Sequence, residues 1–204
     1  MTDFGFIHRF VPATKPALPP LLLLHGTGGD ENDLLPLGQQ LSPGAALLSP
    51  RGKVLENGMA RFFRRLAEGV FDLADLKTRT VELADFITAA RTAYGLELPV
   101  AVGFSNGANI AAALLLMRPG TLAGALLMRA MLPFEPQPLP DLASMPVLLL
   151  SGAADPMVPA ASRDRLAAVL RDAGAAVSHE VVAAGHNLTQ SDLALAAPWL
   201  EHLQ

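Results

Sequence analysis

The sequence predicts a doubly wound α/β domain with a mostly parallel sheet, and two observations support this fold class. Short apolar runs recur along the chain, at residues 21–24, 45–48, 100–104, 122–128 and 147–150. Segments with helical spacing separate these runs. Strands that are apolar on both faces are typical of a parallel sheet with helices on both sides, and their alternation with helices indicates right-handed βαβ units.

Local signals place the individual elements. Aromatic residues alternate with other residues over 4–10, which predicts a half-exposed first strand, and the last strand is expected over 177–182. Helices are predicted over residues 33–41, 73–94, 106–117, 160–173 and 189–203. Gly95 and Gly174 end two of these helices, and the last helix begins with the capping-box-like sequence Thr189-Gln190-Ser191-Asp192.

The composition fits a single domain over residues 1–204. Hydrophobic residues make up 51% of the chain and charged residues 17%, which allows a large core. The net charge of -4 argues against a nucleic-acid binder, and the lack of cysteine excludes disulfide scaffolds, thiolate metal sites and a cysteine nucleophile.

No apolar run approaches the roughly 18 residues of a membrane span, and the N-terminus lacks the basic region of a signal peptide. We therefore expect a cytoplasmic protein.

The strongest functional signal is Gly103-Phe104-Ser105-Asn106-Gly107, between a predicted strand and a predicted helix. The pattern G-x-S-x-G in this context is typical of a nucleophile elbow, a turn so tight that the residues flanking the serine must be small. The hydroxyl then lies at a helix N-terminus, which favours developing negative charge. The pattern alone is weak, since an ordinary βα turn can contain it, but its context predicts that Ser105 is a nucleophile.

A nucleophilic serine needs a base, and the base needs an orienting acid. His186 follows the last predicted strand directly and is the histidine best placed above the sheet. Asp155 follows the apolar run 147–150 and lies between Ser105 and His186 in the chain, the order expected for this fold. The alternatives are a loop histidine at 186 and an Asx turn or helix cap at Asp155.

Ester chemistry also needs backbone N–H groups that face the carbonyl oxygen as it becomes negative. The amide of Asn106 is one expected donor, and Thr27 in His25-Gly26-Thr27-Gly28-Gly29 is the other, with His25 supporting the loop. The glycines also resemble the start of a dinucleotide fingerprint, but Glu31 occupies the place of its third glycine and the acids at 30, 31 and 33 would repel a pyrophosphate. The same acids lack the spacing of a calcium loop. We therefore expect no cofactor and no metal.

Together these motifs resemble the small carboxylesterase/phospholipase branch of the α/β hydrolases, which includes acyl-protein thioesterases. The resemblance covers almost the whole chain and is carried by residues 25–31, 103–107, 152–159 and 185–186. Within the branch, residues 49–52 and 56–65 are similar to a bacterial subgroup of hydrolases, some associated with quinone or hydroquinone stress.

The resemblance implies an α/β-hydrolase fold and a serine esterase with Ser105, Asp155 and His186 as its triad. The chain is too short for a large lid domain after the sheet. It departs from the thioesterase pattern at Asn106, where glutamine is common, and in an arginine-rich segment. Both departures argue against long-chain acyl-protein or phospholipid substrates.

The arginine-rich segment, residues 51–71, has two interpretations. It follows a strand end, so part of it should overhang the site. In one interpretation it is a solvent-exposed segment whose arginines form salt bridges with Glu56, Glu68 and Asp30. In the other it forms a shallow, partly aromatic pocket that meets a polar or anionic substrate group. The substrate-binding residues expected in that case are Arg51, Arg61, Phe62 and Met157.

The sequence thus predicts a serine carboxylesterase acting on small to medium ester molecules. Thioesterase, lysophospholipase and dienelactone-type activities use the same machinery and stay open. A non-catalytic ligand-binding protein on a hydrolase scaffold is the alternative from another class. We expect no nucleic-acid partner and no membrane span, and we leave open a homodimer formed through an exposed helix or edge strand.

Overall fold

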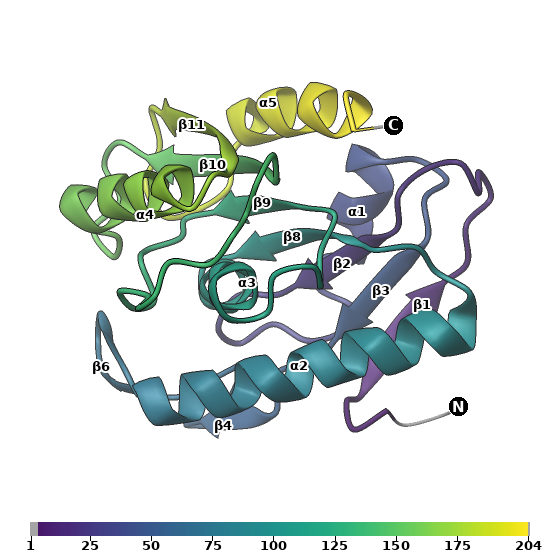
Figure 1. Cartoon of the computed structure of the whole chain (residues 1–204), viewed down its shortest axis with the longest axis horizontal. Coiled ribbons are helices and arrows are strands. Elements are labelled where there is room, and N and C mark those ends of the chain that lie inside the picture. Colours follow the sequence, from purple (N-terminus) through teal and green to yellow (C-terminus); the bar gives the residue numbers. More distant parts are fainter. Residues whose placement is uncertain (1–3, 204) are drawn as a thin grey trace.

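The computed structural model describes residues 4–203 and is built on one seven-stranded sheet (Figure 1). The strands are β1 (His8–Val11), β2 (Leu21–Leu24), β3 (Leu47–Pro50), β8 (Val100–Phe104), β9 (Gly124–Met128), β10 (Pro146–Gly152) and β11 (Ala176–Val182). Their order across the sheet is β1-β3-β2-β8-β9-β10-β11, and every pairing except that of β1 with β3 is parallel. The predicted fold class, a mostly parallel α/β sheet, is confirmed.

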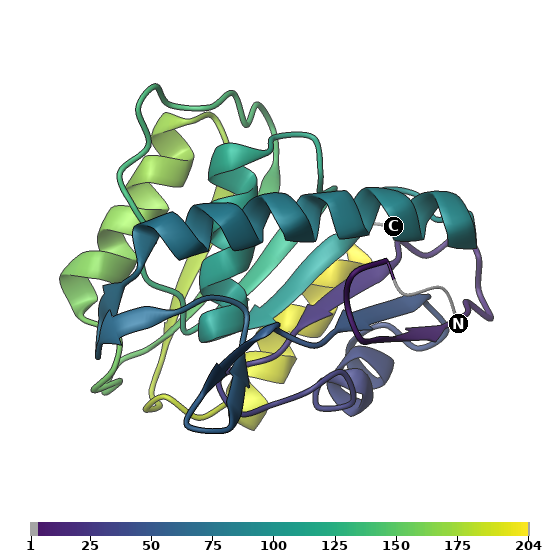
Figure 2. The same ribbon diagram turned by 90° about the horizontal axis from the view of Figure 1, so that it is seen from below.

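Within residues 4–203, five helices cover both faces of this sheet. They are α1 (Leu35–Leu41), α2 (Leu73–Tyr94), α3 (Asn106–Met117), α4 (Ala160–Asp172) and α5 (Gln190–Glu201). Side chains of β2 alternate between two hydrophobic cores. Leu22 and Leu24 belong to the core that also contains residues of α2, α3 and α4, whereas Leu21 and Leu23 belong to the core that contains residues of α1 and α5. Figure 2, turned by 90°, shows α2 running across one face of the sheet.

Two short hairpins lie between β3 and α2. The first pairs β4 (Val54–Glu56) with β5 (Met59–Arg61), and the second pairs β6 (Arg65–Ala67) with β7 (Val70–Phe71). Asn57 and Gly58, with φ of 52° and 80°, form the two-residue loop of the first hairpin. Asn-Gly with two positive φ angles is the preferred loop of a tight hairpin. These four strands were not predicted from the sequence, although the dipeptide Asn57-Gly58 indicates a tight hairpin.

The first strand also differs from its prediction over residues 4–10. The strand β1 begins only at His8, since Gly5 has a φ of 83° and breaks the extended backbone. Phe6 turns inward instead, and its ring lies 5.0 Å from that of Phe86 on α2. Most other predicted elements begin within two residues of the observed ones.

The described range, residues 4–203, has no large lid domain after the sheet. None of its helices combines the length and hydrophobicity that a bilayer crossing requires.

His25 ties the end of β2 to the loop that follows β3. It is buried, with 1% of its surface exposed. Its Nδ1 lies 2.6 Å from the carbonyl oxygen of Gly26, and its Nε2 lies 3.0 Å from the amide nitrogen of Gly52. An amide can only donate, so Nε2 accepts and Nδ1 carries the proton, which is the neutral form of the ring. Burial accordingly lowers the pKa of His25, although nearby acids oppose the shift.

We predict that Leu149→Ala lowers the free energy of unfolding by about 2–5 kcal/mol, because it opens a cavity in a fully buried strand. Urea denaturation followed by circular dichroism measures this loss. Leu66→Ala is the matched control. Leu66 is 73% exposed, so its truncation should change stability by no more than about 0.5 kcal/mol. Equal losses in the two variants would contradict the assignment of the core.

A second prediction concerns the pH dependence of stability. In the unfolded chain His25 takes up a proton near pH 6.5, whereas in the folded chain its lowered pKa delays protonation. The wild type should therefore lose stability as the pH falls below about 6.5, by at most about 1.4 kcal/mol per pH unit from this residue.

The variant His25→Gln lacks this contribution. The stability difference between wild type and variant should shrink as the pH falls from about 8 to about 5.5. Denaturation curves measured over that range test it, and a difference that stays constant with pH would contradict the neutral, buried state of His25.

Candidate active site

The site lies at the carboxyl edge of the sheet, where the turn between β8 and α3 places Ser105. This residue has a φ of 52° and a ψ of -113°, a conformation that is rare for a residue with a side chain. The glycines on either side make the turn possible. A Cβ at Gly107 would lie 2.0 Å from the carbonyl oxygen of Leu24, and one at Gly103 would lie 2.7 Å from the Cα of Ala108. The Ser105 amide donates to the carbonyl oxygen of Met128 at 2.9 Å, which anchors the turn to β9.

The structure brings Ser105, His186 and Asp155 together from three loops. The Nε2 of His186 lies 2.9 Å from the Oγ of Ser105, and its Nδ1 lies 2.9 Å and 3.1 Å from the two carboxylate oxygens of Asp155. A proton on Nδ1 bound to the carboxylate leaves Nε2 free to accept the serine proton. This arrangement is able to deprotonate the hydroxyl as it attacks an electrophile.

The carboxylate of Asp155 is fixed and shielded from solvent. Its Oδ1 accepts hydrogen bonds from the amides of Met157 at 2.8 Å and Val158 at 3.2 Å. The side chain of Asp155 is 1% exposed, whereas that of His186 is 18% exposed. The imidazole is thus reachable from solvent while its orienting acid is not. The ring of Phe104 lies 5.4 Å from the imidazole and packs beside it.

Thr27 and Asn106 line the same pocket as Ser105. Asn106 is the first residue of α3, where backbone N–H groups have no carbonyl partner within the helix. Its side-chain oxygen accepts a hydrogen bond from the Phe62 amide at 2.7 Å, whereas its Nδ2 is buried and has no hydrogen-bond partner among the described residues. The hydroxyl oxygen of Thr27 accepts a bond from Arg61 Nη1 at 2.7 Å, and the Gly28 amide donates to Ala60 at 2.9 Å. These contacts attach the Thr27 loop to β5.

The pocket is small, with a cavity volume of about 40 Å³, and opens to solvent. Of the four predicted substrate-binding residues, it includes Arg61 and Met157 but not Arg51 or Phe62. Arg51 donates to Glu31, at 2.8 Å for one of its two bonds, and Phe62 is 2% exposed with its ring 4.7 Å from that of His25. Neither residue is among those that line the cavity.

Several residues that line the pocket were not predicted from the sequence. They are Arg65, Glu68, Gly69, Phe71, Asn109, Arg129, Met131 and Val158. Arg129 and Met131 follow β9, so a search at the end of the apolar run 122–128 would have found them. The others come from the β6–β7 hairpin, from the first turn of α3 or from beyond Asp155, where the sequence has no distinct motif.

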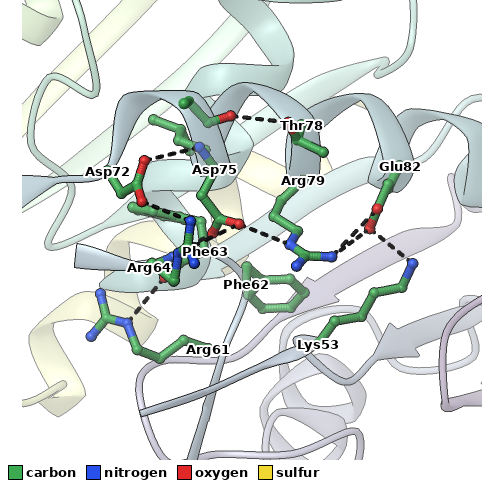
Figure 3. Close-up of polar contacts among 12 residues, drawn as sticks. Lys53, Arg61, Phe62, Phe63, Arg64, Asp72, Asp75, Thr78, Arg79 and Glu82 are labelled. Carbon is green, nitrogen blue, oxygen red and sulfur yellow. Dashed lines mark hydrogen bonds and ion pairs between the residues drawn. The ribbon is translucent and has the colours of Figure 1, made fainter. Parts of the chain in front are cut away.

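The arginines of residues 51–71 are paired with acids. Glu56 lies 3.3 Å from Arg61 and 2.8 Å from Arg65, and Arg65 also lies 3.4 Å from Glu68. Figure 3 shows how this segment joins the start of α2: the Arg64 amide donates to Asp75 at 2.8 Å, and its guanidinium pairs with Asp72 at 2.9 Å. These contacts favour the salt-bridged interpretation of the segment.

Within residues 4–203, no group of three histidine or acidic side chains is arranged to hold a metal ion.

Comparisons with known proteins identify the family of the chain. Residues 74–204 match the Phospholipase/Carboxylesterase family. The chain is 49% identical over 181 residues to the protein MhqD of Bacillus subtilis (strain 168), named as a hydrolase, and the match covers 88% of this chain and 90% of MhqD.

Solved structures are similar over nearly the full length. A Bacillus cereus carboxylesterase superposes with a TM-score of 0.95 at 42% identity, covering 100% of both chains. The structure of YahD with malic acid superposes with a TM-score of 0.92 at 30% identity, covering 98% of this chain and 100% of that one. The elbow, the sheet and these similarities lead to one assignment: the chain is an α/β hydrolase of the phospholipase/carboxylesterase family.

Proposed function

We propose that this hydrolase is a serine carboxylesterase that cleaves small to medium esters through an acyl-enzyme on Ser105. One observation carries the proposal. The side chains of Ser105, His186 and Asp155 form a continuous hydrogen-bonded series, with a serine–imidazole distance of 2.9 Å, at the edge of an open pocket. Membership of a carboxylesterase family supports the same chemistry.

The reaction begins when Ser105 Oγ attacks the ester carbonyl carbon and His186 Nε2 takes the hydroxyl proton. The carbonyl oxygen becomes negative and is stabilised by the backbone amides of Thr27 and Asn106. When the tetrahedral intermediate collapses, the bond to the alcohol oxygen breaks and His186 returns the proton to that oxygen.

Water then enters and His186 takes one of its protons as the oxygen attacks the acyl-serine. The second intermediate releases the carboxylic acid, and Ser105 regains its proton from His186. Asp155 remains ionised and holds the imidazole in the required tautomer throughout. Every step uses groups of this chain, the substrate and water.

The shape of the pocket favours small substrates. Its walls come from the β6–β7 hairpin, Arg61, Met157 and the side chains at the start of α3, and four of these wall residues are charged or polar: Arg61, Arg65, Glu68 and Asn109. The related YahD was solved with malic acid, a small polar acid. Thioester, lysophospholipid and lactone substrates use the same steps, so a panel of esters and thioesters of varied acyl length decides among them.

We predict that Ser105→Ala lowers kcat for a short p-nitrophenyl ester by at least about 10⁴-fold, because the nucleophile is lost. The far-UV circular dichroism spectrum should not change. Ser178→Ala is the matched control: Ser178 is an exposed residue of β11, and its variant should retain wild-type turnover.

A fluorophosphonate probe separates the enzyme from a non-catalytic binding protein. It should label the wild type and Ser178→Ala but not Ser105→Ala. Turnover or labelling that persists in Ser105→Ala would refute the assignment of the nucleophile.

We further predict that Arg61→Ala lowers kcat/KM for neutral and carboxylate-bearing esters by similar factors. The charge of Arg61 is offset by Glu56 at 3.3 Å, and its bond to Thr27 supports a loop that both ester classes use. Steady-state kinetics on a matched pair of esters measures both factors. A loss confined to the carboxylate-bearing ester would instead support direct recognition of an anionic group by Arg61.

A further inference from the structure

Arg129 is a buried cation that the chemistry above does not use. It directly follows β9, and none of its surface is exposed. Its φ of 59° is unusual for a residue with a long side chain and ends the extended course of the strand. A strained backbone that carries a buried charge beside an active site calls for a functional explanation.

All five N–H groups of its guanidinium have acceptors. Nη1 and Nη2 each donate to one carboxylate oxygen of Asp192 at 2.8 Å. The other bonds go to backbone carbonyl oxygens, from Nε to Gly185 at 3.0 Å, from Nη2 to Asn187 at 3.0 Å and from Nη1 to Leu150 at 3.3 Å. The site therefore uses the full planar fork of an arginine, which a lysine cannot reproduce.

Two of these carbonyls belong to the residues on either side of His186. Gly185 and Asn187 lie in a loop without regular secondary structure, so their positions depend on such contacts. The residue before Arg129 contacts the other partner: Met128 accepts the Ser105 amide bond at 2.9 Å. Residues 128 and 129 thus contact both the nucleophile turn and the base loop.

Asp192 completes the arrangement from the other side. It is fully buried at the start of α5, where it also accepts bonds from the amide and hydroxyl of Thr189 at 2.7 Å and 2.9 Å. Burial alone would raise the pKa of Asp192, but the hydrogen bonds from Arg129 and Thr189 outweigh it and hold the pKa below its usual value. Both partners are therefore charged, and the guanidinium has a fixed anchor.

We propose that Arg129 is a positioning residue that holds the His186 loop, through the carbonyls of Gly185 and Asn187, at hydrogen-bonding distance from Ser105. Arg129 borders the pocket, but its side chain has no exposed surface and all its N–H groups are bound to protein acceptors, so it acts through the loop. The proposal rests on the proposed esterase function, in which His186 is the base.

A purely structural ion pair is the competing explanation. Buried ion pairs contribute little net stability, because the cost of removing two charges from water offsets their attraction. Stability alone therefore does not explain an arginine at this position. The need to hold the two carbonyls on either side of His186 does explain it. The two explanations differ in what happens to kcat in a variant that stays folded.

The test compares Arg129→Met, Arg129→Lys and Asp192→Asn with the wild type on a p-nitrophenyl ester, below the melting temperature of each protein. Arg129→Met should lower kcat by about 10²-fold, because a small displacement of the base has a large effect on rate, while KM changes by less than about threefold. Arg129→Lys keeps a positive charge opposite Asp192, but an ammonium group cannot bond both loop carbonyls and Asp192 in the same plane. This variant should therefore lower kcat by about 10-fold or more. Asp192→Asn weakens the anchor of the guanidinium but keeps both loop carbonyls as its acceptors, so it should lower the melting temperature and lower kcat by less than Arg129→Met does.

Leu170→Ala is the control for destabilisation alone, since Leu170 is buried on α4 and belongs to none of the three catalytic loops. It should lower the melting temperature and leave kcat near the wild-type value. If the loss of kcat in all four variants is simply proportional to the drop in melting temperature, the proposal is overturned. A folded Arg129→Met variant with wild-type kcat would also overturn it.

A spectroscopic readout separates this proposal from the esterase function. The Nδ1 proton of His186, bound to Asp155, should give a downfield NMR signal that is absent from His186→Gln. The signal should weaken or vanish in folded Arg129→Lys and persist in Leu170→Ala. If it stays unchanged in Arg129→Lys, the proposal fails even where the esterase activity stands. If the wild type lacks Ser105-dependent turnover, the proposed function fails, and this signal still tests the placement of the loop.

Discussion

The turn that joins β8 to α3 is the constraint on which the remaining structure depends. It holds Ser105 in a conformation that few residues with side chains adopt, and it does so because α3 packs very closely on the end of β2. Only glycine at 107 allows that approach, since a Cβ there would lie 2.0 Å from the Leu24 carbonyl oxygen. Nearly all of α3 is buried, so the packing of this helix offsets the strain of the turn.

The parallel sheet makes this turn useful. In such a sheet every strand ends at the same edge, so the loops after β10 and β11 meet the turn after β8. Asp155 and His186 come from those loops, and the intervening strand β9 contributes Met128 and Arg129. The loop after β2 and the end of β5 are joined by the bond between Thr27 and Arg61.

The arginine-rich segment shows how charge is used in the walls of the pocket. Its guanidiniums connect the hairpins to one another, to α2 and to the loop that contains Thr27. The Phe62 amide adds a bond to the side chain of Asn106, at the base of the elbow. The segment therefore stabilises the pocket, even though its sequence is typical of an exposed polar segment. Its acids are close enough to offset the arginines, which argues against a strongly positive pocket.

Local physical chemistry made much of this protein predictable from its sequence. Apolar runs indicated the strands of the main sheet, and glycines around Ser105 indicated a strained turn, because each signal depends on residues close together in the chain. The dipeptide Asn57-Gly58 contained the same kind of information about the first hairpin. The positions of Asp155 and His186 after their strands followed from the rule that parallel strands end at one edge.

The tertiary structure decided which polar side chains meet. Arg51 and Arg61 are similar residues in the same segment, yet one pairs with Glu31 outside the pocket and the other lines it. Arg129 had no motif at all, and its role emerges only because its five acceptors come from segments 21 to 63 residues away in the chain. A sequence pattern records periodicity and backbone requirements, whereas the pairing of a buried charge depends on strand order and packing between distant segments, which no local pattern encodes.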